Sequence, residues 1–348
     1  MVAESSLEVH RLLRYHRYSS PTQPLKYMKV GVFSAILSNV SLEQALDHIA
    51  GLKCDCIEIG TGAYPGDAHC KPKQLLANEG KLKEFVAAVK QRGLEISSLS
   101  CHGNPIHPDK ALAKEHHDVF QATVKLASKI GVPVVTTFSG CPGDHAGAKY
   151  PNWVTCPWPP DFLEILKWQW EKVAIPYWQK QTKFAADHGV KKIALEAHPG
   201  FLVYNPETML RLRDATSEVL GSNFDPSHFF WQGIDPVKAV RKLEGAIHHV
   251  HAKDTFLYKI NGDFDGYLDT KPYSDEKNRA WLFRTVGYGH GADFWTDFVS
   301  TLRLCGYDGA LSMEHEDSLM SPAEGLRKGV EFLQNIVLRD AKGAVTWA

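Results

Sequence analysis

The chain has 348 residues, of which 44% are hydrophobic and 23% charged, a composition typical of a folded globular protein rather than a disordered one. Its 39 basic residues almost balance its 40 acidic residues, and the formal net charge is −1. Because no excess of positive charge is available for a phosphate backbone or an anionic lipid, we expect neither nucleic-acid nor membrane binding. No stretch reaches the roughly 18 consecutive apolar residues of a membrane-spanning helix.

The first 27 residues carry charges throughout and lack the apolar core of a secretory signal. We interpret residues 1–27 as an N-terminal extension and residues 28–348 as a single domain. The seven cysteines are odd in number and scattered, and no pair has the C-x-x-C spacing of a zinc or redox site. They are expected to be buried or loop thiols in a reducing compartment, which indicates a cytoplasmic protein.

Short segments rich in β-forming residues alternate along the chain with longer segments of helical periodicity. Eight strands are predicted, at Lys29–Phe33, Cys54–Ile59, Leu94–Ser100, Pro133–Phe138, Lys192–Glu196, Ser222–Asp225, Ile247–His251 and Ala310–Glu314. The predicted helices are Ser41–Leu52, Lys81–Arg92, Lys110–Ile130, Asp161–His188, Pro206–Thr216, Pro236–Leu243, Ala292–Cys305 and Pro322–Val337. Glycines at 93, 131, 189 and 306 follow four of these helices, as expected at helix ends.

Eight successive strand–helix units predict a parallel sheet, since parallel strands need a crossover helix between them. The number eight favours an α/β fold of the (β/α)8 TIM barrel type. A doubly wound open sheet is the alternative, but it usually carries a glycine-rich turn after its first strand, and residues 33–37 contain no glycine.

Long loops follow strands 4 and 7, at Ser139–Pro160 and Thr255–Gly291. Loops after barrel strands lie on the face where barrel chemistry takes place. We expect the second loop to cover the barrel mouth, with an ordered insertion between subunits as the alternative.

The last four strands each end in a side chain able to bind a metal, and these are Glu196, Asp225, His251 and Glu314. Taken singly, each has an ordinary explanation as a solvated carboxylate or a structural histidine. Together, three carboxylates at one barrel mouth would repel one another unless a cation neutralised them. The mixed oxygen and nitrogen donors predict one divalent ion, with Mn²⁺ expected and Mg²⁺ or Co²⁺ as alternatives.

The motifs around these residues resemble the xylose isomerase-like TIM barrel family, which includes D-tagatose 3-epimerase and inosose dehydratase. They are LEAHP around Glu196, the D-x-x-H of Asp225 and His228, the H-x-K-D that begins at His251, and SMEHED around Glu314. The resemblance covers about residues 28–338. It implies that the four residues hold one divalent metal, commonly manganese, that Glu196 and Glu314 are the catalytic acid and base, and that His228 contacts the substrate. The long loops and the N-terminal extension depart from the family, which leaves the substrate open.

Other polar residues are candidates for contacts with a substrate. His102 and Glu58 could donate to or accept from sugar hydroxyls, or could be satisfied structural groups. Lys253 lies two residues beyond His251 and could pair with a ligating carboxylate, polarise a carbonyl or form a surface salt bridge. In the long loops, the candidates are His145, Trp153, Trp158, Arg284 and Tyr288, whereas His198, His248, His249 and His315 are expected to pack or support.

These residues predict a divalent-metal-dependent sugar isomerase or epimerase that transfers a proton next to a carbonyl through an enediolate. The alternative is a lyase or C-deglycosidase that eliminates an aglycone from a 3-oxo-glycoside after the same proton abstraction. A DNA-repair endonuclease on the same barrel and a non-catalytic sugar-binding barrel are the competing classes, and the net charge argues against the first. The expected partner is a small-molecule sugar, in a homo-oligomer or with a small partner subunit for a deglycosidase.

Overall fold

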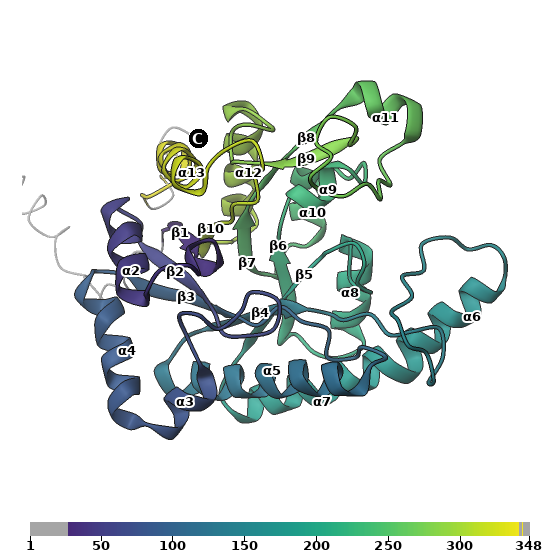
Figure 1. Ribbon diagram of the computed structural model, residues 1–348, viewed down its shortest axis with the longest axis horizontal. Coiled ribbons are helices and arrows are strands. Elements are labelled where there is room, and N and C mark those ends of the chain that lie inside the picture. The colour runs from purple at the N-terminus through teal and green to yellow at the C-terminus, as the bar shows by residue number, and fades with distance from the viewer. Residues whose placement is uncertain (1–26, 341–342, 344–348) are drawn as a thin grey trace, which may run out of the picture. The chain divides into compact units, whose positions relative to one another are not determined.

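Eight parallel strands close into a barrel in the computed structural model, which describes residues 27–340 and residue 343 (Figure 1). In barrel order the strands are β1 (Lys29–Phe33), β10 (Ala310–Met313), β7 (Ile247–Ala252), β6 (Leu220–Phe224), β5 (Lys192–Glu196), β4 (Val134–Phe138), β3 (Glu95–Ser100) and β2 (Cys56–Gly60). The compact unit that contains them is Met28–Leu338. The predicted (β/α)8 barrel is therefore confirmed. Of the predicted extension, residues 1–26 lie outside the described residues.

Helices connect successive strands and surround the barrel (Figure 1). They are α2 (Leu42–Gly51), α3 (Pro72–Ala77), α4 (Glu79–Gln91), α5 (Lys110–Ile130), α6 (Asp161–Trp168), α7 (Ile175–Asp187), α8 (Pro206–Asp214), α9 (Ser227–Phe230), α10 (Pro236–Lys242), α12 (Ala292–Leu304) and α13 (Pro322–Ile336), with a short 3₁₀ helix at Ser34–Leu37. The side chain of Ser41 begins α2 by accepting from the Gln44 amide, and Asp109 begins α5 in the same way. No helix among the described residues is long and apolar enough to cross a membrane.

The predicted helix Asp161–His188 is not a single α-helix. Between α6 and α7 the residues Gln169–Ala174 form a π-helix, and the amide of Ile175 bonds to the carbonyl of Trp170, five residues earlier. Pro176, which has no amide to donate, follows this π-helical segment as the second residue of α7. The periodicity of the sequence did not reveal this change of register.

The loop after β7 contains secondary structure that the sequence did not predict. β8 (Asp254–Leu257) and β9 (Trp281–Arg284) pair antiparallel, and α11 (Lys259–Asp265) lies between them. Figure 1 shows the three elements together beside α9. The loop after β4, residues 139–160, has no helix or strand.

Apolar side chains fill the space between the strands and the surrounding helices, and the largest fully buried ones include Trp170, Trp178 and Trp295. Among the cysteines, Cys56, Cys70, Cys101 and Cys141 are buried thiols, and Cys156 is an exposed one. Unlike the aliphatic layers that usually fill a TIM barrel, buried polar residues on the strands hydrogen-bond across the barrel. They include Glu58, Thr136, His249 and Ser312.

Candidate active site

The carboxyl ends of four neighbouring strands bring the four predicted ligands together. Glu196 ends β5, Asp225 follows β6, His251 is the next-to-last residue of β7, and Glu314 follows β10. Each offers one ligand atom, and these four atoms lie within 4.8 Å of one another. His251 Nδ1 lies 3.2 Å from Glu196 Oε2 and 3.1 Å from Glu314 Oε2. Parallel strands place residues so far apart in the sequence at one edge of the sheet.

The atoms that face the centre of this cluster form ion pairs with one another and with Lys253, but no hydrogen bond of good geometry. Asp225 Oδ2, His251 Nδ1 and Glu314 Oε2 are all buried and have no hydrogen-bond partner of acceptable geometry. Buried polar atoms in native proteins are rarely left in this state, and each such case calls for an explanation. Three carboxylates and one imidazole form a donor set that suits Mn²⁺, Mg²⁺ or Co²⁺. The residues present therefore fit a divalent cation.

Glu196 is held from several sides. His228 Nε2 lies 3.1 Å from Oε1, His102 Nε2 lies 3.1 Å from Oε2, and the Asn223 side-chain amide donates to Oε2 at 3.3 Å. Burial raises the pKa of Glu196, but the hydrogen bonds from His102, His228 and His251 outweigh burial and hold this pKa well below its usual value. Glu196 is therefore ionised at neutral pH.

Lys253 is a buried cation beside the cluster. Its Nζ lies 3.2 Å from Asp225 Oδ2, 2.9 Å from Glu314 Oε2 and 3.1 Å from Glu316 Oε2. Burial lowers the pKa of Lys253, but these carboxylates raise it well above its usual value, and Lys253 is charged. A surface salt bridge is thus excluded for Lys253, which pairs with two of the predicted metal ligands.

Burial and neighbouring charges separate the pKa values of the other two carboxylates. Burial raises the pKa of Asp225 to about 6, and Lys253 opposes this rise. Burial also acts on Glu314, but Lys253 and His251 outweigh it and lower the pKa of Glu314 to about 2. Because Glu196 is ionised as well, the cluster carries more negative charge than Lys253 alone compensates.

A second group of possible metal-binding atoms lies deeper in the barrel, formed by Glu58, His249 and His251. Here the facing atoms bond to one another, since His249 Nε2 and His251 Nε2 lie 2.9 and 3.0 Å from Glu58 Oε2. Ser312 donates to the same oxygen at 2.7 Å. Because hydrogen bonds already satisfy these atoms, this deeper group does not need a cation. The cluster of predicted ligands at the carboxyl ends of the strands, called the upper cluster below, lacks such hydrogen bonds and is the better candidate for a cation site.

Aromatic rings form walls around the cluster. Phe33, which ends β1, stacks on His251 with ring centres 5.5 Å apart. Phe138, which ends β4, lies 4.6 Å from the ring of His102, and Phe283 of β9 lies 4.6 Å from Lys253 Nζ. The loop after β7 thus reaches the site through Phe283. Apolar walls of this kind lower the local dielectric constant and strengthen the electrostatic interactions of the site.

Two predicted substrate-binding residues, His145 and Arg284, do not face the buried cluster and instead pair with aspartates. The His145 side chain is 67% exposed and its Nδ1 pairs with Asp144 at 2.8 Å. Arg284 binds the carboxylate of Asp317 through Nε at 3.1 and 3.2 Å. Of the loop aromatics, Trp158 is exposed and Trp153 packs against Tyr204. The roles of His145 and Arg284 stay predictions that need a moving loop or a bound ligand.

Several residues at the site had no clear signal in the sequence. Asn223 and Phe33 end or nearly end strands, which is the one feature that could have marked them. Phe283 contacts the site through a hairpin that was not predicted. Glu58 was expected either to bind sugar hydroxyls or to be a satisfied structural group, and its hydrogen bonds to the protein support the second.

Comparison with known proteins adds the family. A model of the xylose isomerase-like TIM barrel family matches residues 46–336. The chain belongs to this family. The uncharacterized protein YfiH of Bacillus subtilis is 42% identical over 312 residues, which cover 89% of this chain and 99% of that protein. An inosose dehydratase of Mesomycoplasma hyopneumoniae is 26% identical over 328 residues, which cover 90% of this chain and 97% of that protein.

Solved structures share the fold. A probable 3-DHS dehydratase, AsbF of Bacillus anthracis, has a TM-score of 0.61 at 16% identity and covers 88% of this chain and 99% of its own. A D-tagatose 3-epimerase-like protein has a TM-score of 0.59 at 23% identity and covers 89% of this chain and 98% of its own. These structures show the shared fold, and the family together with the inosose dehydratase match supports a sugar-modifying enzyme.

Proposed function

We propose that the protein is a divalent-metal-dependent sugar isomerase or epimerase that transfers a proton next to a carbonyl group. The observation that carries this proposal is the buried cluster of Glu196, Asp225, His251 and Glu314, in which three carboxylates face one another and their facing atoms form ion pairs but no hydrogen bond of good geometry. Mn²⁺ is the expected ion. A bound cation would polarise the substrate carbonyl and acidify the neighbouring C–H group.

The two glutamates differ in ways that suit an acid–base pair. Glu314 is the more open, with a side chain 16% exposed compared with 4% for Glu196, and it can meet a substrate that enters from the barrel mouth. Glu196 is buried, but its Oε1 lies 3.1 Å from His228 Nε2, so that a proton taken up there can be shared with the imidazole. Two bases on different strands allow a proton to leave one face of a planar enediolate and return to the other.

Lys253 and the aromatic walls complete this mechanism. The ammonium group lies within 3.2 Å of Asp225 and Glu314, where it keeps both carboxylates oriented and can donate to a substrate oxygen. Phe33, Phe138 and Phe283 limit the access of water to the proton that is being transferred. The substrate is a small sugar or sugar derivative, and homo-oligomerisation and a cytoplasmic location remain predictions.

Elimination is the second candidate. The inosose dehydratase that matches 90% of this chain supports it, because dehydration begins with the same removal of a proton next to a carbonyl. A lyase or C-deglycosidase acting on 3-oxo-glycosides would use the same two glutamates and then expel an aglycone.

The test is incubation of the Mn²⁺-loaded protein in D₂O with free ketoses and with 3-oxo-glucosides, followed by NMR and mass spectrometry. We expect deuterium at the carbon next to the carbonyl, and a fall of about 10²-fold or more in turnover for Glu196→Gln and for Glu314→Gln, in line with the usual contribution of general acid–base catalysis. Glu324→Gln is the matched control, since Glu324 pairs with Lys328 on the outside of α13. Release of water or an aglycone would assign elimination. Turnover without deuterium incorporation, or glutamine variants with full activity, would show that the proposal is wrong.

A further inference from the structure

Glu58 is a fully buried carboxylate that the proposed chemistry does not use. It lies on β2, below the cluster of predicted metal ligands, and its side chain has no exposed surface. A buried ionised carboxylate costs several kcal/mol unless it is paired and hydrogen-bonded. Because burying an ionised carboxylate costs free energy, we expect Glu58 to have a role other than filling space in the barrel.

The hydrogen bonds of Glu58 link it to the metal ligand His251. Glu58 Oε1 accepts from Thr136 Oγ1 at 2.8 Å, and Oε2 accepts from Ser312 Oγ at 2.7 Å. Both hydroxyls fix the plane of the carboxylate. His251 Nε2 then lies 3.0 Å from Oε2, while its Nδ1 faces Glu196 and Glu314. The two ring nitrogens of His251 thus face opposite ways along the barrel.

This geometry selects the tautomer that His251 would adopt with a cation in the cluster. A cation between Glu196 and Glu314 needs the lone pair of Nδ1, and the acceptor-only carboxylate of Glu58 beside Nε2 holds the remaining hydrogen on that nitrogen. Phe33 stacks on the same ring at an interplanar angle of 24° and limits its rotation. Carboxylates that hold ligating histidines in this way raise their basicity and their affinity for metal.

We propose that Glu58 is a positioning residue for the metal and holds His251 with Nδ1 directed at Glu196 and Glu314. This inference rests on the proposed function, because it assumes that the upper cluster binds a divalent ion. Glu58 acts through His251 and touches neither the ion nor the substrate.

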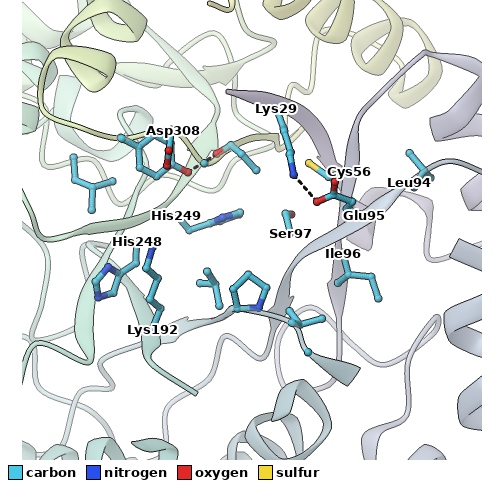
Figure 2. Close-up of a pocket in the computed structure, with 18 of the residues that line it drawn as sticks. Lys29, Cys56, Leu94, Glu95, Ile96, Ser97, Lys192, His248, His249 and Asp308 are labelled. Carbon is cyan, nitrogen blue, oxygen red and sulfur yellow. Dashed lines mark hydrogen bonds and ion pairs between the residues drawn. The ribbon is translucent and has the colours of Figure 1, made fainter. Parts of the chain in front are cut away.

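The network also reaches the opposite end of the barrel. His249 Nε2 donates to Glu58 Oε2 at 2.9 Å and lies on the wall of a cavity of about 660 Å³ at the amino-terminal ends of the strands. Figure 2 shows His249 there with Cys56, Ser97 and Lys29. Two side chains, His249 and Glu58, therefore lie between this cavity and His251.

The test compares Mn²⁺ binding to the wild type, Glu58→Gln and Thr182→Val by isothermal titration calorimetry. Glutamine keeps the volume of Glu58 but removes its charge and places an amide that can donate beside the imidazoles. We expect the Kd for Mn²⁺ to rise about 10- to 100-fold in Glu58→Gln, the range found for such supporting residues. Thr182→Val is the control, because Thr182 is also buried and donates to the carbonyl of Gln179 within α7 rather than to Glu58 or its partners; its Kd should equal that of the wild type.

A second readout separates positioning from general loss of structure. The visible absorption bands of bound Co²⁺ report the ligand field, and we expect them to shift in Glu58→Gln and to stay unchanged in Thr182→Val. If Glu58→Gln does not fold, ¹⁵N NMR of the Mg²⁺-loaded wild type can determine which ring nitrogen of His251 carries the hydrogen. We expect a protonated Nε2 and an unprotonated Nδ1. An unprotonated Nε2 in the wild type would overturn the inference. So would a Glu58→Gln variant whose Kd for Mn²⁺ and Co²⁺ spectrum equal those of the wild type. Failure of the wild type to bind Mn²⁺ would instead overturn the proposed function.

Discussion

Lys253 balances charge at the site as a single buried residue. Its ammonium group contacts Asp225, Glu314 and Glu316 within 3.2 Å, and it is 2% exposed. Removing one partner of a buried ionic group leaves the others without compensation, which costs more than the pair contributes. A divalent ion would lie against two of the same carboxylates, Asp225 and Glu314, so that Lys253 and the ion would together neutralise their charge.

We therefore expect Lys253→Met to destabilise the metal-free protein by about 3 kcal/mol or more and the Mn²⁺-loaded protein by clearly less. Urea unfolding with and without Mn²⁺ measures both values. Lys238→Met is the control, because Lys238 is exposed and pairs only loosely with Asp235 on α10, and it should change neither. An equal loss of stability in the two forms of Lys253→Met would contradict shared neutralisation.

At this scale the sequence predicted the four cluster residues because each ends or nearly ends a strand. It could not predict that Glu58 lies below them, because its place depends on the register shift between β2 and β3 at Ile57 and Glu58. It also could not rank the loop residues. His145 and Arg284 resembled Lys253 as polar candidates, and only packing distinguishes an exposed histidine from a buried lysine.

Among the elements, the loop after β7 is held in place by Asp254, the last residue of the H-x-K-D motif. Its Oδ2 accepts from the amides of Gly287, Gly289 and His290 and from Trp295 Nε1, at 2.8 to 3.2 Å. A side chain at Gly289 would meet Asp254 Oδ1 at 2.5 Å, so only glycine permits this close approach. Asp254 thus holds the C-terminal end of the loop after β7, directly after the strand β9 that carries Phe283.

Asp254→Asn should loosen this end of the loop, because it removes the negative charge and replaces one of the two oxygens, of which Oδ1 accepts from the Thr255 amide and lies 2.8 Å from His290 Nδ1. With bonds to charged acceptors worth about 1.5–3 kcal/mol each, we expect amide exchange at Gly287, Gly289 and His290 to accelerate about tenfold or more. Hydrogen–deuterium exchange by mass spectrometry measures this. Asp275→Asn, in the same loop, is the control, since Asp275 accepts from the side chain of Asn278. Unchanged exchange in Asp254→Asn would show that the loop is held elsewhere.

The elements that the sequence missed share a cause. The β8–β9 hairpin pairs residues 254–257 with 281–284, and such pairing between distant segments leaves little local periodicity to detect. The π-helix at Gln169–Ala174 differs from its α-helical neighbours by one hydrogen-bond step, which side-chain patterns do not resolve. The helices with clear starting residues, such as Asp109 before α5, were placed well.

For the whole molecule, binding of the ion should add to the stability of the barrel, because its ligands come from β5, β6, β7 and β10. A ligand at 100 times its Kd that binds only the native state adds about 2.7 kcal/mol. We expect Mn²⁺ to raise the Tm by several degrees, EDTA to reverse the rise, and Asp225→Asn to abolish it. Differential scanning fluorimetry measures all three, and an equal rise in Asp225→Asn would place the ion elsewhere.

The reactivity of the buried cysteines described above can be used to measure local opening of the barrel. Burial raises the pKa of Cys101 and of Cys141 to about 12, and burial likewise raises the pKa of Cys56 and of Cys70. Since it is the thiolate that attacks an alkylating reagent, these four thiols react only when their surroundings open, whereas the exposed Cys156 reacts at once. A time course of iodoacetamide labelling, read by peptide mass, should therefore reveal the order in which β2, the segment before α3, the end of β3 and the loop after β4 come apart.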